Sequence, residues 1–382
     1  MTELCLERET EPRRALENHE SASRARGELL KAFVEGMNSS GIEYCLLSGV
    51  HGYPEATDSD VDFMVSPEDI ARVEPLLQEV ATGCGARLVQ AMRHETEACY
   101  FVLTKQVGSA IAFLHPDCTA DYRRNGRLWM TAAPLLQKRR RYKEFFLPAV
   151  ADEFQYYLIK KVLKQNLGDA ELARLRALYL SDPEGCCNRV RRCCSRRTSG
   201  KLVAALMRHD LAWIRSQLPS LLAELYRTDP LENWLRRGMQ RLREGRRWVR
   251  RIANPTGLSI GVCGGNAKNR ADVAAALERN LRPAFRRTKI IEEGEGGGWL
   301  DLSLWLSKVR STLVIRKRET VRRGTLSRNE LCFELGGATE RSVDFIVREV
   351  LEWMAGRQRC RMKMNAAGSP RSQAMADTEC DA

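Results

Sequence analysis

The sequence predicts a mixed α/β (α+β) protein in which two α/β units are separated by a helical region. Three observations support this fold class. Short apolar runs of strand length alternate with helical patterns over the first 120 residues. Between residues 152 and 253, apolar residues recur almost only at helical spacing. After the turn-forming Pro255-Thr256-Gly257, a strand pattern leads through a glycine-rich loop into another helix.

The first unit is predicted to form a mixed sheet with accompanying helices. Residues 1–20 are charged and lack an apolar core, which predicts a flexible tail. Helices are expected over 22–37 and 66–80, the second opened by a Ser-Pro cap. Strand patterns occupy residues 43–49, 61–65, 86–92, 98–105 and 109–115. Together these elements predict a domain over residues 21–150.

The remainder of the chain divides into three predicted segments. Residues 151–253 read as a helical extension that ends in a basic linker helix. Residues 254–360 predict a second, smaller α/β domain. The last segment, 361–382, is polar and is expected to be a disordered tail.

The composition excludes several classes of protein. The chain is 43% apolar and 29% charged, as in ordinary globular proteins, so a wholly disordered or fibrous chain is excluded. No apolar stretch approaches the roughly 18 residues of a transmembrane helix. The charged N-terminus lacks the apolar core of a secretory signal, so a cytoplasmic location is expected. The thirteen scattered cysteines are therefore expected to be free thiols.

The charge is strongly basic, with 62 Lys and Arg against 49 Asp and Glu. The excess is concentrated in residues 234–251, which hold eight arginines and one glutamate. Such a helix could bind an anionic membrane surface or nucleic acid, or it could connect domains and pack its apolar stripe on a neighbour. The sequence favours the interdomain interpretation. Nucleic acid is not expected as a partner, because no recognisable binding motif accompanies the charge.

Two carboxylates stand at the start of a predicted strand. Asp60 and Asp62 are two residues apart, and alternate residues of a strand share a face, so we expect them to lie about 7 Å apart. Adjacent carboxylates suit Mg²⁺. A third carboxylate from a neighbouring strand would complete a two-metal site for phosphoryl or nucleotidyl transfer. The alternative is that both are ordinary loop and strand-start acids.

The order strand, Ser48-Gly49, loop, Asp60-x-Asp62 resembles the nucleotidyltransferase superfamily related to DNA polymerase β. The segment FLHPDCTADYRRNGR, residues 113–127, resembles a bacterial subfamily found with surface-polysaccharide biosynthesis genes. The resemblance implies that Asp117 is the third catalytic and metal-binding carboxylate beside Asp60 and Asp62. It also implies nucleotide-binding roles for Ser48, Gly49, Arg123, Arg124, Lys160 and Lys161.

Residues 253–281 resemble the start of a thymidylate-kinase-like P-loop domain. A P-loop uses glycines whose amides hold phosphate, a lysine for the outer phosphates and a hydroxyl for Mg²⁺. Here Arg270 stands at the lysine position and Ala271-Asp272 replace the hydroxyl pair. We therefore expect a degenerate kinase domain, kept for packing or interaction and without kinase activity. The residues of its altered loop are Gly264, Gly265, Lys268 and Arg270.

The favoured function is Mg²⁺-dependent transfer of a nucleotidyl group from an NTP to a small-molecule, sugar-linked or protein hydroxyl. The alternative is a non-catalytic regulatory or scaffold protein of a polysaccharide-assembly system. The aspartates favour the enzyme, whereas Val50, where the superfamily prefers Gly or Ser, and the altered P-loop favour the scaffold. The expected partners are an NTP, an unknown hydroxyl acceptor and polysaccharide-assembly proteins, with a membrane surface as a further candidate for the basic helix.

Overall fold

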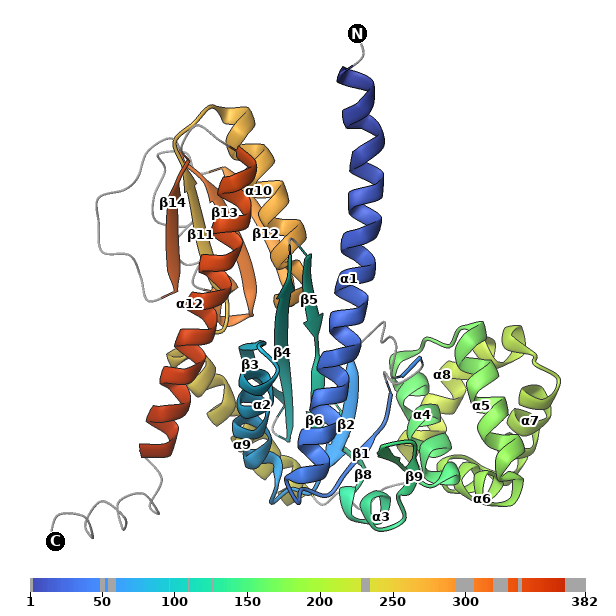
Figure 1. Ribbon diagram of the computed structural model, residues 1–382. Helices are drawn as coiled ribbons and strands as arrows, with labels where there is room; N and C mark the ends of the chain where they lie inside the picture. The colour runs from blue at the N-terminus through green and yellow to red at the C-terminus, as the bar shows by residue number, and fades with distance from the viewer. Residues whose placement is uncertain are drawn as a thin grey trace, which may run out of the picture.

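The computed structural model describes residues 3–48, 52–53, 60–95, 97–108, 110–124, 127–227, 234–292, 306–318, 329–335 and 339–367. It is a mixed α/β protein with a mixed first sheet, a helical region and a second sheet (Figure 1). This confirms the fold class that the sequence predicts. Among the helices of these ranges, none is long and apolar enough to cross a bilayer.

The first sheet has the strand order β1-β2-β6-β4-β3, with β5 paired to β4. Every pair is antiparallel except β2 and β6, which are parallel. Five of the strands fall within the predicted strand patterns or overlap them. The sixth, β6, was not predicted, because Pro116 and its polar residues give it no apolar strand pattern. The strands are β1 (Tyr44–Leu46), β2 (Val61–Val65), β3 (Arg87–Glu95), β4 (Ala98–Val107), β5 (Ala110–Leu114) and β6 (Pro116–Thr119).

Helices α1 (Glu3–Ser39) and α2 (Ile70–Gly83) cover one face of this sheet (Figure 1). Alternate residues of a strand point to the same face, so β2 sends Val61, Phe63 and Val65 into the core beneath these helices. Helix α1 begins at Glu3, and so the segment 1–20, predicted as a tail, is largely helical. The prediction of a tail rested on charge alone. The glutamate, arginine, leucine and alanine residues of this segment are good helix formers, which explains the helix.

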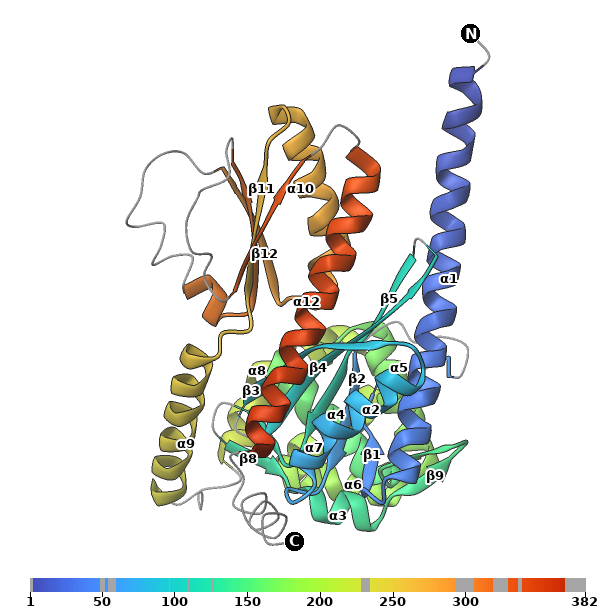
Figure 2. The same cartoon turned by 60° about the vertical axis from the view of Figure 1, so that its left-hand side comes forward.

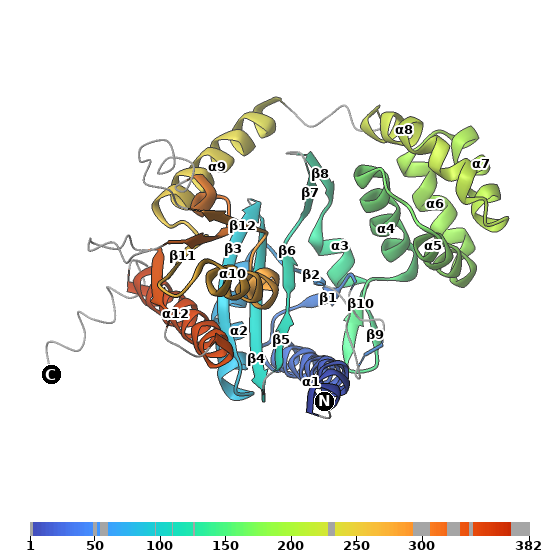
Figure 3. The same cartoon turned by 90° about the horizontal axis from the view of Figure 1, so that it is seen from above.

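The helical region packs on part of the opposite face of the first sheet. Its core includes Cys45, Leu47 and Met64, which alternate along β1 and β2 with the residues facing α1 and α2. From above, the first sheet lies between this region and the C-terminal elements (Figure 3). The helices are α4 (Val150–Lys164), α5 (Asp169–Ser181), α6 (Pro183–Cys193), α7 (Arg196–Met207) and α8 (Leu211–Arg227).

The C-terminal sheet is parallel throughout, in the order β12-β13-β11-β14. Helices α10 and α12 share its core, which also contains Val89, Val102 and Phe113 of the first sheet. The first sheet and the C-terminal unit therefore have an apolar core in common. The elements are β11 (Leu258–Cys263), α10 (Ala267–Leu281), η1 (Arg282–Ala284), β12 (Arg287–Glu292), β13 (Thr312–Lys317), β14 (Glu330–Glu334) and α12 (Thr339–Ala367).

Helix α12 continues to Ala367, seven residues into the segment 361–382 that the sequence predicts to be disordered. The residues after 367 lie outside the described ranges.

Short elements connect the first sheet to the helical region. They are β7 (Tyr122–Arg124), β8 (Arg127–Met130), α3 (Ala132–Gln137), β9 (Arg140–Tyr142) and β10 (Phe145–Leu147).

Helix α9 (Trp234–Ala253) carries the arginine-rich sequence and lies near the start of the C-terminal sheet (Figure 2). The favoured expectation was that its apolar stripe packs on a neighbouring domain. The structure contradicts this, because Leu242 and Val249 are exposed while Arg247 and Arg251 contact the protein. The surface beneath the helix offers carbonyl oxygens and hydroxyls, which pair with guanidinium groups rather than with aliphatic side chains.

Candidate functional site

Asp62 and Asp117 lie opposite each other on neighbouring strands. The parallel register of β2 and β6 pairs the two residues directly, and Tyr100 of β4 lies opposite Asp117 on its other side. Residues in register project to the same face, so all three belong to the face that Met64 also occupies. The helical core covers this face at β1 and β2, and the C-terminal core covers it at β3 to β5. The two carboxylates therefore lie between these cores.

Two side chains bond the same oxygen of Asp62. The hydroxyl of Ser48, just after β1, donates to Oδ2, and Nζ of Lys160 on α4 lies 2.5 Å from it. The Lys160 ion pair is mostly buried. Gly49 and Val50, which follow Ser48 in the predicted phosphate-binding turn, lie outside the described residues. Two of the predicted nucleotide-binding residues thus meet at one of the predicted catalytic carboxylates.

The Asp117 carboxyl is electrostatically strained. Its pKa is raised from the ordinary value to about 7, chiefly by burial and also by the neighbouring Asp62 carboxylate, while Lys160 acts in the opposite direction. Burial also raises the pKa of the adjacent Tyr100 hydroxyl. A positively charged group placed beside Asp117 would relieve the repulsion between the two carboxylates.

Asp60 is more exposed than the other two predicted carboxylates, and its charge contributes to the raised pKa of Asp117. Its side chain is 53% exposed, and Oδ1 lies 3.3 Å from Nδ1 of His115. The other ring nitrogen of His115, Nε2, lies 2.9 Å from the Pro283 carbonyl oxygen of the C-terminal unit. Because β2 begins at Val61, Asp60 stands just before the alternating part of the strand, and its sharing of a face with Asp62 stays a prediction.

The two carboxylates could hold one Mg²⁺, but they do not supply all of the ligands that the ion needs. Within the described ranges, no group of three or more His, Cys, Asp or Glu side chains gathers closely enough to hold a metal. Asp62 and Asp117 nevertheless form a facing carboxylate pair. Mg²⁺ is commonly held by one or two carboxylates, with water and substrate phosphates filling its other positions. The two-metal site with Asp60 stays a prediction.

Positive charge surrounds the carboxylate pair. Burial lowers the pKa of Lys164, one turn after Lys160 on α4, and the Lys160 and Arg124 charges lower it further while Asp62 opposes them. Lys160, Lys164 and Arg124 therefore act on one another electrostatically near Asp62. Such a cluster of cations is suited to a polyphosphate.

Other predicted phosphate contacts are engaged elsewhere. Nε of Arg123 lies 2.7 Å from Glu97, and Nζ of Lys161 lies 2.8 Å from Glu171 on α5. Lys160 and Lys161 are neighbours on one helix, yet about 100° apart around its axis. This explains why one reaches Asp62 and the other pairs with a neighbouring helix.

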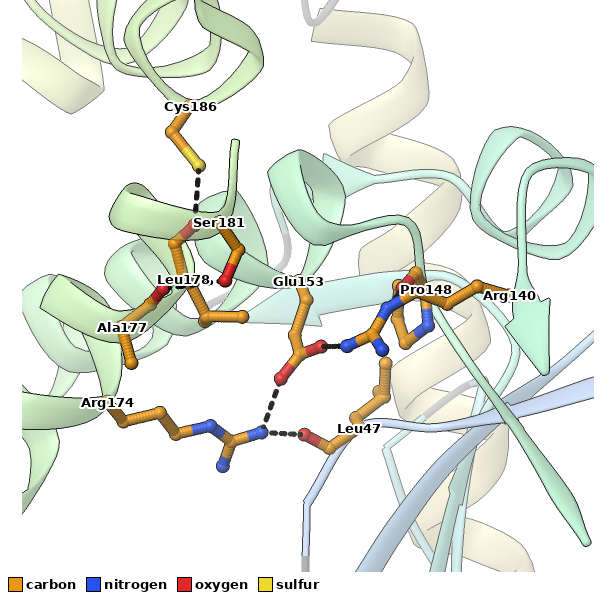
Figure 4. A network of polar contacts seen from close by, with 9 residues as sticks. All are labelled: Leu47, Arg140, Pro148, Glu153, Arg174, Ala177, Leu178, Ser181 and Cys186. Atoms are coloured by element: carbon orange, nitrogen blue, oxygen red, sulfur yellow. Dashed lines mark hydrogen bonds and ion pairs between the residues drawn. The ribbon is translucent and has the colours of Figure 1, made fainter. Parts of the chain in front are cut away.

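A buried polar network holds the site in place, and no sequence motif pointed to it. Glu153 of α4 accepts bonds of 2.9 Å from both Arg140 and Arg174 (Figure 4). Arg174 also donates to the Leu47 carbonyl oxygen at 3.2 Å. The network therefore ties the residue before Ser48 to the helix that carries Lys160. The acid in the first turn of α4 was visible in the sequence, but its partners come from distant segments.

The glycine-rich loop of the C-terminal unit bonds to itself. Gly264 and Gly265 follow β11 with φ of +73° and +60°, a conformation that glycine adopts readily. Asn266 caps α10 by accepting from the Asn269 amide at 2.8 Å. The Arg270 guanidinium then donates to the Gly264 and Gly265 carbonyl oxygens at 3.3 and 2.8 Å. Lys268 is exposed near the start of α10.

Comparison with known proteins adds one weak likeness. No protein-family model matches the chain, and no curated protein matches it. One solved structure, from Thermotoga maritima and described as a candidate nucleotidyltransferase, is similar at 10% sequence identity with a TM-score of 0.25. The likeness covers 36% of this chain and 86% of that one. At this level the neighbour says nothing about the activity of the chain, which has to be inferred from its own residues.

Proposed function

We propose that the protein transfers a nucleotidyl group from an NTP to a hydroxyl acceptor in a Mg²⁺-dependent reaction. The observation that supports this most is the facing pair Asp62 and Asp117, with Lys160 and Ser48 converging on the same carboxylate. The pair combines metal-binding oxygens with a neighbouring source of positive charge. The sequence resemblance to the nucleotidyltransferase superfamily rests on the same residues.

The basic residues would bind and orient the NTP. Lys160, Lys164 and Arg124 supply positive charge beside the carboxylates, where the triphosphate would lie. Ser48 offers a hydroxyl at the start of the loop after β1. Asp62 and Asp117 would hold Mg²⁺, which neutralises phosphate charge and lowers the pKa of an acceptor hydroxyl.

The proposed reaction is an in-line substitution at the α-phosphorus. The acceptor oxygen forms a new bond to this phosphorus as the bond to the oxygen of the β-phosphate breaks. Pyrophosphate leaves with the electron pair of that bond, and the hydroxyl proton passes to water. The chain contributes by holding the phosphates on Lys160 and Lys164, so that the reacting atoms are aligned and the developing charge is neutralised.

The acceptor is proposed to be a hydroxyl on a sugar or a sugar-linked carrier. This rests on the resemblance of residues 113–127 to the subfamily found with surface-polysaccharide genes. Of that segment, Asp117 lies in the carboxylate pair, and Arg127 is buried over the ring of Trp129 at 4.6 Å. The C-terminal unit is proposed to be a degenerate kinase domain without activity of its own.

A non-catalytic scaffold is the second candidate. It is favoured by the Arg270 contacts to its own glycine loop and by the contact of Asp60 with His115. In this case Lys160 would serve permanently as the counter-ion of Asp62, and no nucleotide would displace it. Nucleotide binding therefore distinguishes the two candidates.

The proposed function is tested by calorimetry of the full chain with each of the four NTPs, in Mg²⁺ and in Mn²⁺. We expect one NTP to bind only with the metal, and we expect Asp62→Asn to weaken this binding roughly 100-fold by removing a metal-binding charge. Asp169→Asn is the matched control, because Asp169 is an exposed acid that pairs with His209 on the helical region. Its affinity should equal that of the wild type.

Either of two results would contradict the enzyme. Folded wild-type protein that binds no NTP with either metal would leave the scaffold as the better account. Metal-dependent binding that persists in Asp62→Asn would place the nucleotide elsewhere in the molecule. Circular dichroism of each variant establishes that the chain is folded before its affinity is compared.

A further inference from the structure

Helix α9 is oriented with two of its arginines, Arg247 and Arg251, toward the protein. Arg251 donates to the Val309 carbonyl oxygen at 2.7 Å and to the Ser311 hydroxyl at 2.8 Å. Arg247, one turn earlier, pairs with Glu244 at 2.8 Å and donates to the Arg93 carbonyl oxygen at 3.4 Å. Burial lowers the pKa of Arg251 to about 10, since its guanidinium is partly removed from water. The contact face of α9 is therefore polar.

The opposite face of α9 exposes apolar side chains. Leu242 and Val249 are 67% and 66% exposed and lie two turns apart, so they form the centre of one stripe. A surface helix of a globular protein normally turns such a stripe inward. Here the usual arrangement is reversed. The other exposed apolar residues of the stripe and its edge are Met239, Trp248 and Ile252.

Exposed arginines lie on both sides of this apolar stripe. Arg246 and Arg250 flank it on one side and Arg241 on the other, and all three are exposed. The one acid of the helix, Glu244, is bound to Arg247 on the inner face. The outward surface of α9 thus combines an apolar centre with cationic borders and carries no exposed acid between residues 238 and 253.

We propose that α9 binds in the plane of an anionic phospholipid membrane surface. Its apolar stripe would enter the boundary between headgroups and acyl chains, and its arginines would contact lipid phosphates. Trp248 is a residue type that favours this boundary, but its ring lies beside Arg247 and Arg251 and is only 42% exposed, so the stripe relies mainly on Leu242 and Val249. The helix is about 30 Å long, which allows a contact over several headgroups. This proposal does not depend on nucleotidyl transfer.

Charge complementarity favours lipid over other occupants. Nucleic acid would satisfy the arginines but would leave the apolar stripe in water. A second copy of the chain, paired through the same stripe, would bring arginine borders against arginine borders. A membrane surface satisfies both parts of the pattern at once, because its negative headgroups lie directly above an apolar layer.

The test is sedimentation of the full chain with vesicles of phosphatidylcholine alone or mixed with phosphatidylserine. We expect binding to the mixed vesicles only, weakened by salt. Leu242→Glu with Val249→Glu should weaken it at least roughly 30-fold by placing two acids in the stripe. Arg246→Gln with Arg250→Gln should weaken it by about fivefold per arginine. Leu180→Glu is the matched control, because Leu180 on α5 is 54% exposed, and it should bind as the wild type does.

Three outcomes would overturn the proposal. The first is a folded wild-type chain that binds neither kind of vesicle. The second is equal binding by the wild type and the Leu242→Glu, Val249→Glu variant, which would assign membrane affinity to another surface. The third is a dimer in analytical ultracentrifugation that this variant dissociates, which would assign the stripe to a second copy. Thermal melting establishes that the variants, all on exposed positions, keep their fold.

Discussion

The carboxylate pair and the glycine-rich loop of the C-terminal unit both carry residues typical of phosphate chemistry, but their surroundings differ. At the loop, Arg270 donates to the carbonyl oxygens of Gly264 and Gly265, so its charged group is engaged within the loop. At the first sheet, Asp62 faces Asp117, and repulsion and burial together raise the pKa of Asp117.

The carboxylate pair is therefore electrostatically strained, whereas the glycine-rich loop is not. Strain that the fold maintains between like charges is typical of sites that bind a ligand of opposite charge. In the loop, Arg270 stands at the lysine position of a P-loop, and it would have to leave its contacts with the loop carbonyl oxygens to bind a phosphate. Substitutions at Glu153, at the two lysines, at Asp117 and at Arg270 test the contrast between the two regions, with effects expected to decrease in this order.

Glu153→Ala should cause the largest loss of stability. It removes the carboxylate that binds both Arg140 and Arg174, leaving two partly buried guanidinium groups without it. We expect the free energy of unfolding to fall by about 3 kcal/mol in urea titrations. Glu153→Gln keeps the shape and one acceptor oxygen, so its loss should be smaller. Equal stability of Glu153→Ala and the wild type would mean that the network does not hold α4 to the first sheet.

Lys160→Met and Lys161→Met should have different effects on NTP binding, although the two lysines are adjacent. Lys160 bonds Asp62, whereas Lys161 pairs with Glu171. By removing a charge-assisted contact to the triphosphate, Lys160→Met should weaken metal-dependent NTP binding roughly 30-fold. Lys161→Met should leave it within about threefold of the wild type. Similar losses for both variants in calorimetry would contradict the assignment of Lys160, rather than Lys161, to the nucleotide.

Asp117→Asn should stabilise the metal-free protein in alkaline solution. Because the folded-state pKa is raised from its usual 3.8 to about 7, the folded protein binds more protons than the unfolded chain between these values. Its stability therefore falls as the pH rises through this window. We expect Asp117→Asn to remove a penalty on the order of 2 kcal/mol at about pH 8, and to change little below about pH 4.

Urea titrations of Asp117→Asn without divalent ions, at both ends of this pH range, measure the effect. A variant that is less stable than the wild type at about pH 8 would mean that the carboxyl group is not strained there. Added Mg²⁺ should stabilise the wild type more than the variant, because only the wild type has both carboxylates.

Arg270→Ala should have the smallest effect. The guanidinium bonds only carbonyl oxygens of an exposed loop, so we expect unfolding to change by less than about 1 kcal/mol. NTP affinity should be unchanged. A clear gain or loss of nucleotide binding in calorimetry would show that the loop takes part in recognition and would erase the contrast with the first sheet.

Local patterns predicted most of the fold. The apolar runs at 61–65, 98–105 and 109–115 correspond closely to strands, because each is a mainly apolar segment of strand length. The short strand β6 escaped prediction, since its four residues begin with proline and include two polar residues. The parallel pairing of β2 with β6 could not be read from the sequence, because register depends on contacts between distant segments.

The candidate site was predictable in its residue types but not in its arrangement. Asp62, Asp117, Ser48 and Lys160 come together, whereas Asp60 turns to His115. An Asp-x-Asp spacing implies a shared face only when both residues belong to the strand. The orientation of α9 was likewise invisible, because a helical wheel identifies an apolar stripe without saying which side meets the protein.

The shared core of the first sheet and the C-terminal unit gives the C-terminal helices a structural role that requires no chemistry of their own. Val89, Val102 and Phe113 belong to the first sheet, yet residues of α10 and α12 complete their burial. Exposing them would cost roughly 5 kcal/mol, a large part of what keeps a domain folded. Natural selection would then retain these helices for solubility alone. Gene-deletion experiments that remove them would record lost protein and could mistake it for lost catalysis.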